Sequence, residues 1–225
     1  MNSQLEVLYE DNHLLVINKP AGVLVQGDKT GDIPLVEFAK EYIAKKYGKP
    51  GAVFLGVVHR LDRPVSGVVV FARTSKALER MNALFREKQT EKTYWAIVDN
   101  KPRQIEGKLV HWLVKDENKN KTTAYKQEHK EGLRSELDYK LIGEAGRYYL
   151  IEVKPLTGRP HQIRVQLASM GCPILGDLKY GSAEPTTDGS IALHARQLKF
   201  IHPVKKEPII ISAELPENNW WDVFR

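Results

Sequence analysis

Cysteine is almost absent from this sequence, since Cys172 is the only one among 225 residues. One thiol forms no disulfide within the chain, and it excludes every zinc site that needs several thiolates. A single cysteine is also more typical of a protein of the reducing cytosol than of a secreted one. The seven histidines never lie at metal-ligand spacing from a carboxylate or from the thiol. We therefore expect no metal site.

Long apolar runs are missing as well. The longest apolar clusters, near residues 52–58 and 67–72, fall far short of the roughly 18 residues that a membrane span needs. Residues 1–11 are acidic and interrupted by polar side chains, unlike a signal peptide. No glycine-rich loop of the P-loop or dinucleotide-binding type occurs. These absences predict a cytoplasmic protein that binds no membrane and holds no nucleotide cofactor.

The residues that are present indicate a folded domain. Hydrophobic residues make up 42% of the chain and charged residues 28%, which excludes a disordered tail, a collagen-like fibre and a coiled coil. A single domain of this length buries about 70% of its unfolded surface, which is enough for a core. The net charge of +6 and the isoelectric point of 9.2 favour a polyanionic partner, although many ordinary proteins carry such an excess.

Periodic patterns predict the order of helices and strands. Strands dominate, with helices and loops inserted between them, so we expect an α+β fold with a central, largely antiparallel sheet in a single domain over residues 1–225. The two strands on either side of Gly143-Glu-Ala-Gly146 predict a hairpin. Strands are expected at residues 5–10, 13–18, 52–59, 66–73, 92–98, 133–142, 147–154, 192–200 and 209–215, and helices at 35–47, at 75–88 and from Pro160 to just before Gly171.

The most polar segment of the chain covers residues 115–132, where lysine alternates with acidic and amide side chains. Such a segment is usually the solvated tip of a hairpin, and we favour that interpretation. A contact with nucleic acid is the alternative.

Two stretches carry residues suited to chemistry. In the first, residues 59–67, Asp62 lies between Arg60 and Arg63 in a turn rich in Pro and Gly. Positive neighbours favour the ionised carboxylate, although an aspartate that only caps the turn fits the local sequence equally well.

The second stretch covers residues 157–166, where the expected start of a helix coincides with Arg159 and His161. Backbone N–H groups and cationic side chains there can together receive a phosphate. Arg164 lies beside the apolar face of the same helix, and a buried arginine needs a carboxylate partner. We expect Asp62 to be that partner.

His59-Arg-Leu-Asp62 followed by Ser66-Gly67 resembles the catalytic motif of the RluA-type RNA pseudouridine synthases. Further motifs of the family occur in the same order across nearly the whole chain. The sequence departs from the family pattern at Val65, where Thr is common, and at Gln166, where His is frequent. The matching segments are residues 16–23, 91–96, 157–165, 176–177, 180–181 and 193–195.

The resemblance implies an enzyme that converts specific uridines of ribosomal RNA, transfer RNA or both into pseudouridine. It further implies a single catalytic domain, without the small N-terminal RNA-binding domain that many members carry. Because product and substrate are isomers, the reaction needs no cofactor and no metal. The expected partner is therefore an rRNA or tRNA stem-loop, bound by a monomer with no obligatory protein partner.

The same resemblance implies the roles of individual residues. Asp62 is the catalytic carboxylate, acting either as nucleophile at ribose C1′ or as base at C2′. Arg164 pairs with Asp62, and Tyr94 packs against the uracil near the proton that leaves C5. Arg60 fills the position of the flipped-out base. The remaining expected RNA contacts are His59, which we interpret mainly as a hydrogen-bonded turn residue, and Lys92, Arg159 and His161.

Two other functions remain as alternatives. A retaining glycosidase also attacks an anomeric carbon with a carboxylate, but it needs a second acid about 5–5.5 Å away, and no acidic residue is paired with Asp62 in the motif. A non-catalytic RNA-binding protein would explain the charge but not the combination of Asp62, Tyr94 and Arg164. The sequence does not name the uridine.

Overall fold

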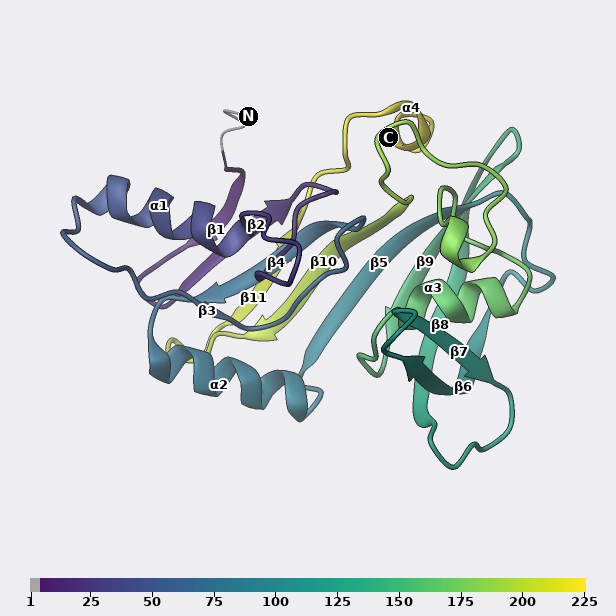
Figure 1. The fold of residues 1–225 in the computed structure, drawn as a ribbon, viewed down its shortest axis with the longest axis horizontal. Coiled ribbons are helices and arrows are strands. Elements are labelled where there is room, and N and C mark those ends of the chain that lie inside the picture. The colour runs from purple at the N-terminus through teal and green to yellow at the C-terminus, as the bar shows by residue number, and fades with distance from the viewer. Residues whose placement is uncertain (1–4) are drawn as a thin grey trace. The chain divides into compact units, whose positions relative to one another are not determined.

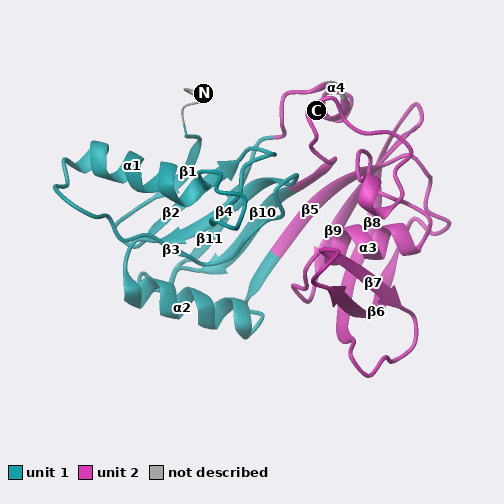
Figure 2. Ribbon diagram, viewed as in Figure 1, with its two compact units in different colours: residues 1–91, 195–214 teal, residues 92–194, 215–225 magenta. Residues whose placement is uncertain are grey.

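A computed structural model describes residues 5–225, and Figure 1 shows their helices and strands. Residues 1–4, which begin the acidic N-terminal stretch, lie outside the described residues. The chain divides into two compact units, coloured separately in Figure 2. Unit 1 consists of residues 1–91 and 195–214, and unit 2 of residues 92–194 and 215–225.

The strands of unit 1 lie in the order β1-β2-β4-β10, with β3 beside β4 and β11 beside β10. The pairings of β1 with β2, β2 with β4, β3 with β4 and β10 with β11 are all antiparallel. Its elements are β1 (Val7–Glu10), β2 (Leu14–Lys19), α1 (Leu35–Tyr47), β3 (Gly56–Val57), β4 (Ser66–Ala72), α2 (Ser75–Arg86), most of β10 (Leu193–Ile201) and β11 (Pro208–Ser212).

The central strands of unit 1, β2 and β4, are buried on both faces. Every residue from Leu14 to Ile17 is fully buried, although successive side chains of a strand point to opposite faces. On one face, Leu14 and Val16 of β2 pack against Ala77 and Met81 of α2. Val68, Val70 and Ala72 of β4 belong to the same cluster. Figure 1 shows α1 and α2 flanking these strands. A strand that is covered on both faces needs a continuous apolar sequence, and β2 and β4 contain one.

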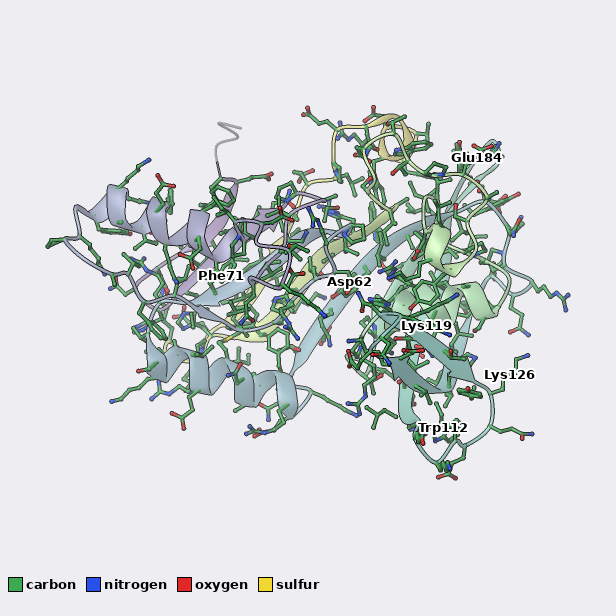
Figure 3. All side chains as sticks on the ribbon, in the orientation of Figure 1. Asp62, Phe71, Trp112, Lys119, Lys126 and Glu184 are labelled. Atoms are coloured by element: carbon green, nitrogen blue, oxygen red, sulfur yellow. The ribbon has the colours of Figure 1, made fainter. Side chains whose placement is uncertain are left out.

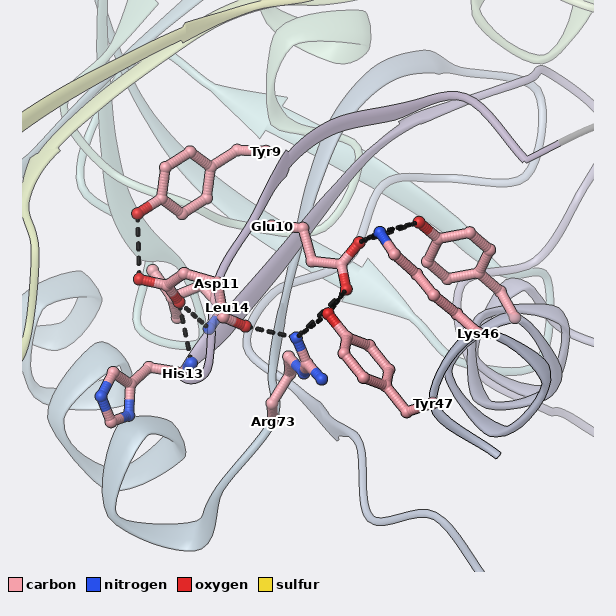
Figure 4. A network of polar contacts seen from close by, with 9 residues as sticks. Tyr9, Glu10, Asp11, His13, Leu14, Lys46, Tyr47 and Arg73 are labelled. Atoms are coloured by element: carbon pink, nitrogen blue, oxygen red, sulfur yellow. Dashed lines mark hydrogen bonds and ion pairs between the residues drawn. The ribbon is translucent and has the colours of Figure 1, made fainter. Parts of the chain in front are cut away.

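Helix α1 is attached to the strands through Glu10, at the end of β1 (Figure 4). The Glu10 carboxylate accepts hydrogen bonds from the hydroxyls of Tyr42 and Tyr47, at 2.8 and 2.6 Å. It also pairs with Lys46 at 2.7 Å and with Arg73 at 3.2 Å. Burial raises the pKa of Glu10, but these bonds to its charged form outweigh burial and lower the pKa. The carboxylate therefore stays charged and holds the helix.

Gly67 in β4 explains why the Ser-Gly motif requires glycine. Its φ is +113°, a left-handed conformation that favours glycine. A Cβ at this position would lie 2.3 Å from the carbonyl oxygen of Ala195. The absence of a side chain thus lets β4 approach Ala195 closely.

Unit 2 is a second antiparallel arrangement, with the strand order β5-β9-β8-β6-β7. Leu113, Val165 and Tyr180 form a small core where α3 packs against β6 and β7. Its elements are most of β5 (Thr90–Val98), β6 (Glu106–Asp116), β7 (Lys121–Tyr125), β8 (Leu133–Ala145), β9 (Tyr148–Pro155), α3 (Gln162–Ser169), the 3₁₀ turn η1 (Leu178–Tyr180) and α4 (Asn219–Asp222).

The predicted α+β class and the largely antiparallel pairing are confirmed. The hairpin between β8 and β9 is also confirmed, with a turn at Gly146 and Arg147 that is tighter than predicted. The polar segment contains a hairpin tip at residues 117–120, but β7 follows it directly. Among the described residues, no helix is long and apolar enough to cross a membrane.

Two predicted elements were wrong in their extent. Of the strand expected at residues 52–59, only Gly56–Val57 forms, and Phe54 of this stretch is 51% exposed, so its apolar character does not indicate burial. The third helix begins at Gln162 rather than at Pro160, because His161 adopts a left-handed conformation with φ of 55°. A helix cannot continue through that residue.

Candidate functional site

The loop that contains Asp62 connects β3 to β4 within unit 1 (Figure 3). Asp62 is half-buried, whereas Arg60 is exposed. His59 begins the loop, and its ring stacks on Phe85 of α2 with 4.9 Å between the ring centroids. Its Nε2 accepts the N–H of Val70 at 3.2 Å, which places the proton of the neutral ring on Nδ1. His59 thus attaches the loop to a strand and a helix, as a turn residue does.

Lys19, at the end of β2, is a buried cation next to this loop. Its side chain is fully buried, and Nζ donates to the carbonyl oxygens of Pro20, Val23 and Arg63 at 3.0, 2.8 and 3.2 Å. Burial lowers the pKa of Lys19 to about 7, although the nearby Asp62 carboxylate acts in the opposite direction. Lys19 therefore ties the turn at residues 20–23 to the residue that follows Asp62.

Arg63 strengthens the same connection. Its carbonyl oxygen accepts the N–H of Gly22 at 2.8 Å, and its Nε donates to the carbonyl oxygen of Gly22 at 2.9 Å. Its guanidinium also pairs with Asp32 at 2.7 Å. The backbone and the side chain of Arg63 thus both bond to Gly22, and these two bonds hold the turn and the Asp62 loop together.

In unit 2, β5 carries Lys92 and Tyr94. The two residues are two positions apart and so lie on the same face of the strand. Both are half-buried, and Tyr94 is opposite Val153 of β9. A Cβ on Gly158 would lie 3.8 Å from Nζ of Lys92, so the lysine amine reaches the loop between β9 and α3. The structure thus brings Lys92 next to the stretch that contains Arg159.

His161 ends that loop, and its ring is oriented by Tyr180. The two side chains are joined through His161 Nδ1 and the Tyr180 hydroxyl at 2.7 Å. The same hydroxyl accepts the backbone N–H of Thr122 at 2.9 Å. The hydroxyl thus bridges the imidazole ring of His161 and the backbone of Thr122, and this contact fixes the orientation of the ring.

Arg164 lies on α3 and forms a buried pair with Asp177. Its Nε and NH2 donate to Oδ2 and Oδ1 of Asp177 at 2.7 and 2.8 Å, a bidentate geometry. Arg164 is 6% exposed and Asp177 is 1% exposed. The guanidinium also lies over the ring of Tyr180, 5.1 Å from its centroid. The pairing of Arg164 with Asp62, which belongs to the other unit, stays a prediction.

Sequence reasoning assigned no role to Lys19, Asp177 or Tyr180, although all three lie in the segments that match family motifs. A buried arginine requires a carboxylate, and Asp177 lies 13 residues after Arg164, so it could have been considered as the partner. Lys19 follows the apolar run at residues 14–17 and Asn18, just before Pro-Ala-Gly, and this position could have marked it as a buried cation. The sequence spacing of Tyr180 and His161 did not predict that their side chains are in contact.

Residues 13–169 match the model of the RNA pseudouridylate synthase family. The chain belongs to this family. An uncharacterized RNA pseudouridine synthase of Synechocystis sp. is 35% identical over 219 residues, which cover 96% of this chain and 67% of that protein. Ribosomal large subunit pseudouridine synthase C of Vibrio vulnificus is 34% identical over 94% of this chain and 66% of its own length. The chain thus spans about two thirds of the length of these two relatives.

Other members of the family are matched over nearly their whole length. The tRNA pseudouridine synthase C of Vibrio cholerae is 32% identical, with 95% of this chain and 92% of that protein covered. Among solved structures, human RNA pseudouridylate synthase domain containing 4 has a TM-score of 0.78 and 26% identity. That similarity covers 94% of this chain and 89% of the human one. The fold is therefore shared as well as the sequence.

Proposed function

We propose that this protein is an enzyme that isomerises specific uridines of ribosomal or transfer RNA to pseudouridine, with Asp62 as its catalytic residue. The observation that carries the proposal is the Asp62 loop, whose family motif is held by a buried lysine in a chain that belongs to the family. The substrate class rests on the relatives, of which one is named for large-subunit ribosomal RNA and another for tRNA.

The reaction breaks the bond between ribose C1′ and N1 of uracil, turns the base, and forms a bond between C1′ and C5. The proton on C5 leaves and N1 gains one, so atoms and electrons balance without a second reactant. Asp62 either attacks C1′ or removes the C2′ proton, since a carboxylate is suited to both tasks. Tyr94 packs against the uracil next to the C5 proton.

The other residues of the site bind and orient the RNA. The bidentate bond to Asp177 fixes the Arg164 guanidinium, which pairs with Asp62 in our proposal. Arg60 is exposed and fills the space left by the flipped uridine. Lys92, Arg159 and His161 contact phosphates, and His59 supports the loop. Units 1 and 2 together form one catalytic domain, which acts in the cytoplasm as a monomer without an obligatory protein partner.

Substitution of Asp62 tests the proposal. Asp62→Asn keeps the shape of the side chain and removes its charge, so pseudouridine formation in large-subunit rRNA or tRNA should fall by several orders of magnitude while RNA binding remains. Asp138→Asn is the matched control, because the Asp138 side chain is 46% exposed and lies 3.7 Å from Lys108. Wild-type activity in the Asp62 variant would disprove the assignment. An RNA-binding wild-type protein that forms no pseudouridine would support the non-catalytic alternative.

A further inference from the structure

Gln162, the first residue of α3, has a side chain that is only 4% exposed and bonded at both ends of its amide. Its Oε1 accepts the hydroxyl proton of Thr157 at 2.8 Å and the backbone N–H of Arg159 at 3.0 Å. Its Nε2 donates to the carbonyl oxygen of Glu136 at 3.0 Å. One buried amide thus connects β8 to two points of the loop at residues 157–161.

The backbone of Glu136 also bonds directly to the chain at the start of the loop. The backbone N–H of Glu136 donates to Oγ1 of Thr157 at 2.9 Å, and its carbonyl oxygen accepts the N–H of Leu156 at 2.9 Å. These bonds continue the pairing of β8 with β9 past its last regular pair. The loop therefore leaves the sheet in a defined direction, and Gln162 closes it.

The backbone of Arg159 is held at both of its polar groups by Gln162. The N–H of Arg159 donates to the Gln162 side chain, and its carbonyl oxygen accepts the backbone N–H of Gln162 at 3.1 Å. The next carbonyl, that of Pro160, accepts the hydroxyl of Thr122 at 3.1 Å. The Arg159 side chain is exposed. Fixed backbone and exposed guanidinium are what preorganised recognition of a phosphate needs.

We propose that Gln162 is a positioning residue that presents the Arg159 guanidinium to a phosphate of the bound RNA. This inference rests on the proposed function, because it assumes that RNA is the substrate. It assigns Gln162 an effect on RNA affinity that passes through Arg159, and no contact with the reacting atoms.

The chain provides a matched control on the same helix. Gln166 lies one turn further along α3 and is fully buried. Its Nε2 contacts Leu109 O at 3.3 Å, Ser135 O at 3.4 Å and His111 Nδ1 at 3.1 Å, all on β6 and β8. Gln166 therefore shares residue type, helix and burial with Gln162, but it bonds to the sheet and not to the loop.

The test is a double-mutant cycle on RNA affinity, with the large-subunit rRNA or tRNA that the wild-type protein modifies as the probe. Arg159→Gln should weaken binding about tenfold, as expected for the loss of one charged hydrogen bond, and reduce the salt slope by about 1. Gln162→Met should weaken binding by a similar factor in the wild-type background and by less than about twofold in the Arg159→Gln background. Gln166→Met should leave affinity unchanged in both backgrounds.

Gln162→Glu keeps the inference testable if Gln162→Met does not fold. Glutamate retains the acceptor for Thr157 and Arg159, replaces the donor to Glu136 by an oxygen and adds a negative charge. Its affinity should therefore fall below that of wild type, and by a smaller factor in the Arg159→Gln background. Additive losses for Gln162 and Arg159, or an equal loss from Gln166→Met, would overturn the inference. Failure of the wild-type protein to form pseudouridine would instead overturn the proposed function, so the two failures are distinguishable.

Discussion

The two units hold their candidate functional loops by different means. In unit 1 the Asp62 loop is tied by the Lys19 ammonium, which donates to three carbonyl oxygens. In unit 2 the loop at residues 157–161 is tied by the neutral amide of Gln162 and by hydroxyls. Both loops leave strands where backbone groups lose their ladder partners, and a buried polar side chain satisfies those groups in each case.

The difference between the two anchors is one of charge. A buried amide does not titrate between about pH 5 and 10. A buried ammonium can lose its proton in this range, because burial disfavours its charged form. The pKa of Lys19 is lowered to about 7 by burial. The stability of unit 1, but not the Gln162 network of unit 2, should therefore respond to pH near neutrality. Three substitutions test this difference between the units.

The largest loss of stability should come from the buried ion pair of unit 2, between Arg164 and Asp177. Asp177→Asn leaves the Arg164 guanidinium in its buried position without its bidentate carboxylate, and breaking a buried pair costs about 3–5 kcal/mol of unfolding free energy. Denaturation in urea measures this loss. Asp138→Asn is the control and should cost less than about 1 kcal/mol, because its ion pair is exposed. Equal effects in the two variants would contradict the assignment of a buried charge pair.

Local patterns predicted most of the elements. The apolar spacing and the terminal glycine predicted α1 at its observed bounds, where Gly48 adopts a left-handed conformation with φ of 56°. The start of α3 could not be predicted in the same way, since the conformation of His161 depends on Tyr180 and Thr122, which are distant in sequence. Tertiary contacts override the local preference of Pro160 for a helix start.

The candidate site was predictable only in part, for a similar reason. The motifs select Asp62, Tyr94 and Arg164 as candidates, but the partner of a buried group depends on the fold. Arg164 was expected to need a carboxylate, yet spacing alone did not select Asp177, which is 13 residues further along the chain. The position of Lys19 after an apolar run hints at burial, but its acceptors are backbone carbonyls, which residue types do not reveal.

A smaller effect should appear in the pH dependence of Lys19→Met. The lysine keeps its ordinary pKa of 10.5 in the unfolded chain and has a pKa of about 7 in the folded one. Between these values the unfolded state binds more protons, so the wild-type protein gains stability as pH rises and the Met variant does not. The difference in unfolding free energy between wild type and Lys19→Met should change by about 1–2 kcal/mol between pH 7 and 9. The carbonyl acceptors stabilise the charged amine and so offset part of the effect of burial on its pKa.

Lys46→Met is the control for this measurement. Lys46 is exposed, and its hydrogen bond to Glu10 raises its pKa, so it does not titrate in the same window. Its effect on stability should be constant from pH 6 to 9. A Lys19→Met difference that is equally constant would show that the buried ammonium keeps its proton throughout.

The smallest effect should come from Asp32→Asn, which removes an ion pair from the Asp62 loop without touching the buried lysine. Asp32 pairs with Arg63 at 2.7 Å, but their side chains are 51% and 47% exposed. Exposed pairs contribute less than about 1 kcal/mol and are screened by salt. The bonds between Arg63 and Gly22 do not involve Asp32, so the loop keeps its geometry. Unfolding free energy and pseudouridine formation should therefore stay near wild type, and any difference should vanish in 1 M NaCl. A loss above about 2 kcal/mol that persists in salt would mean that surface charge, and not Lys19, holds the Asp62 loop.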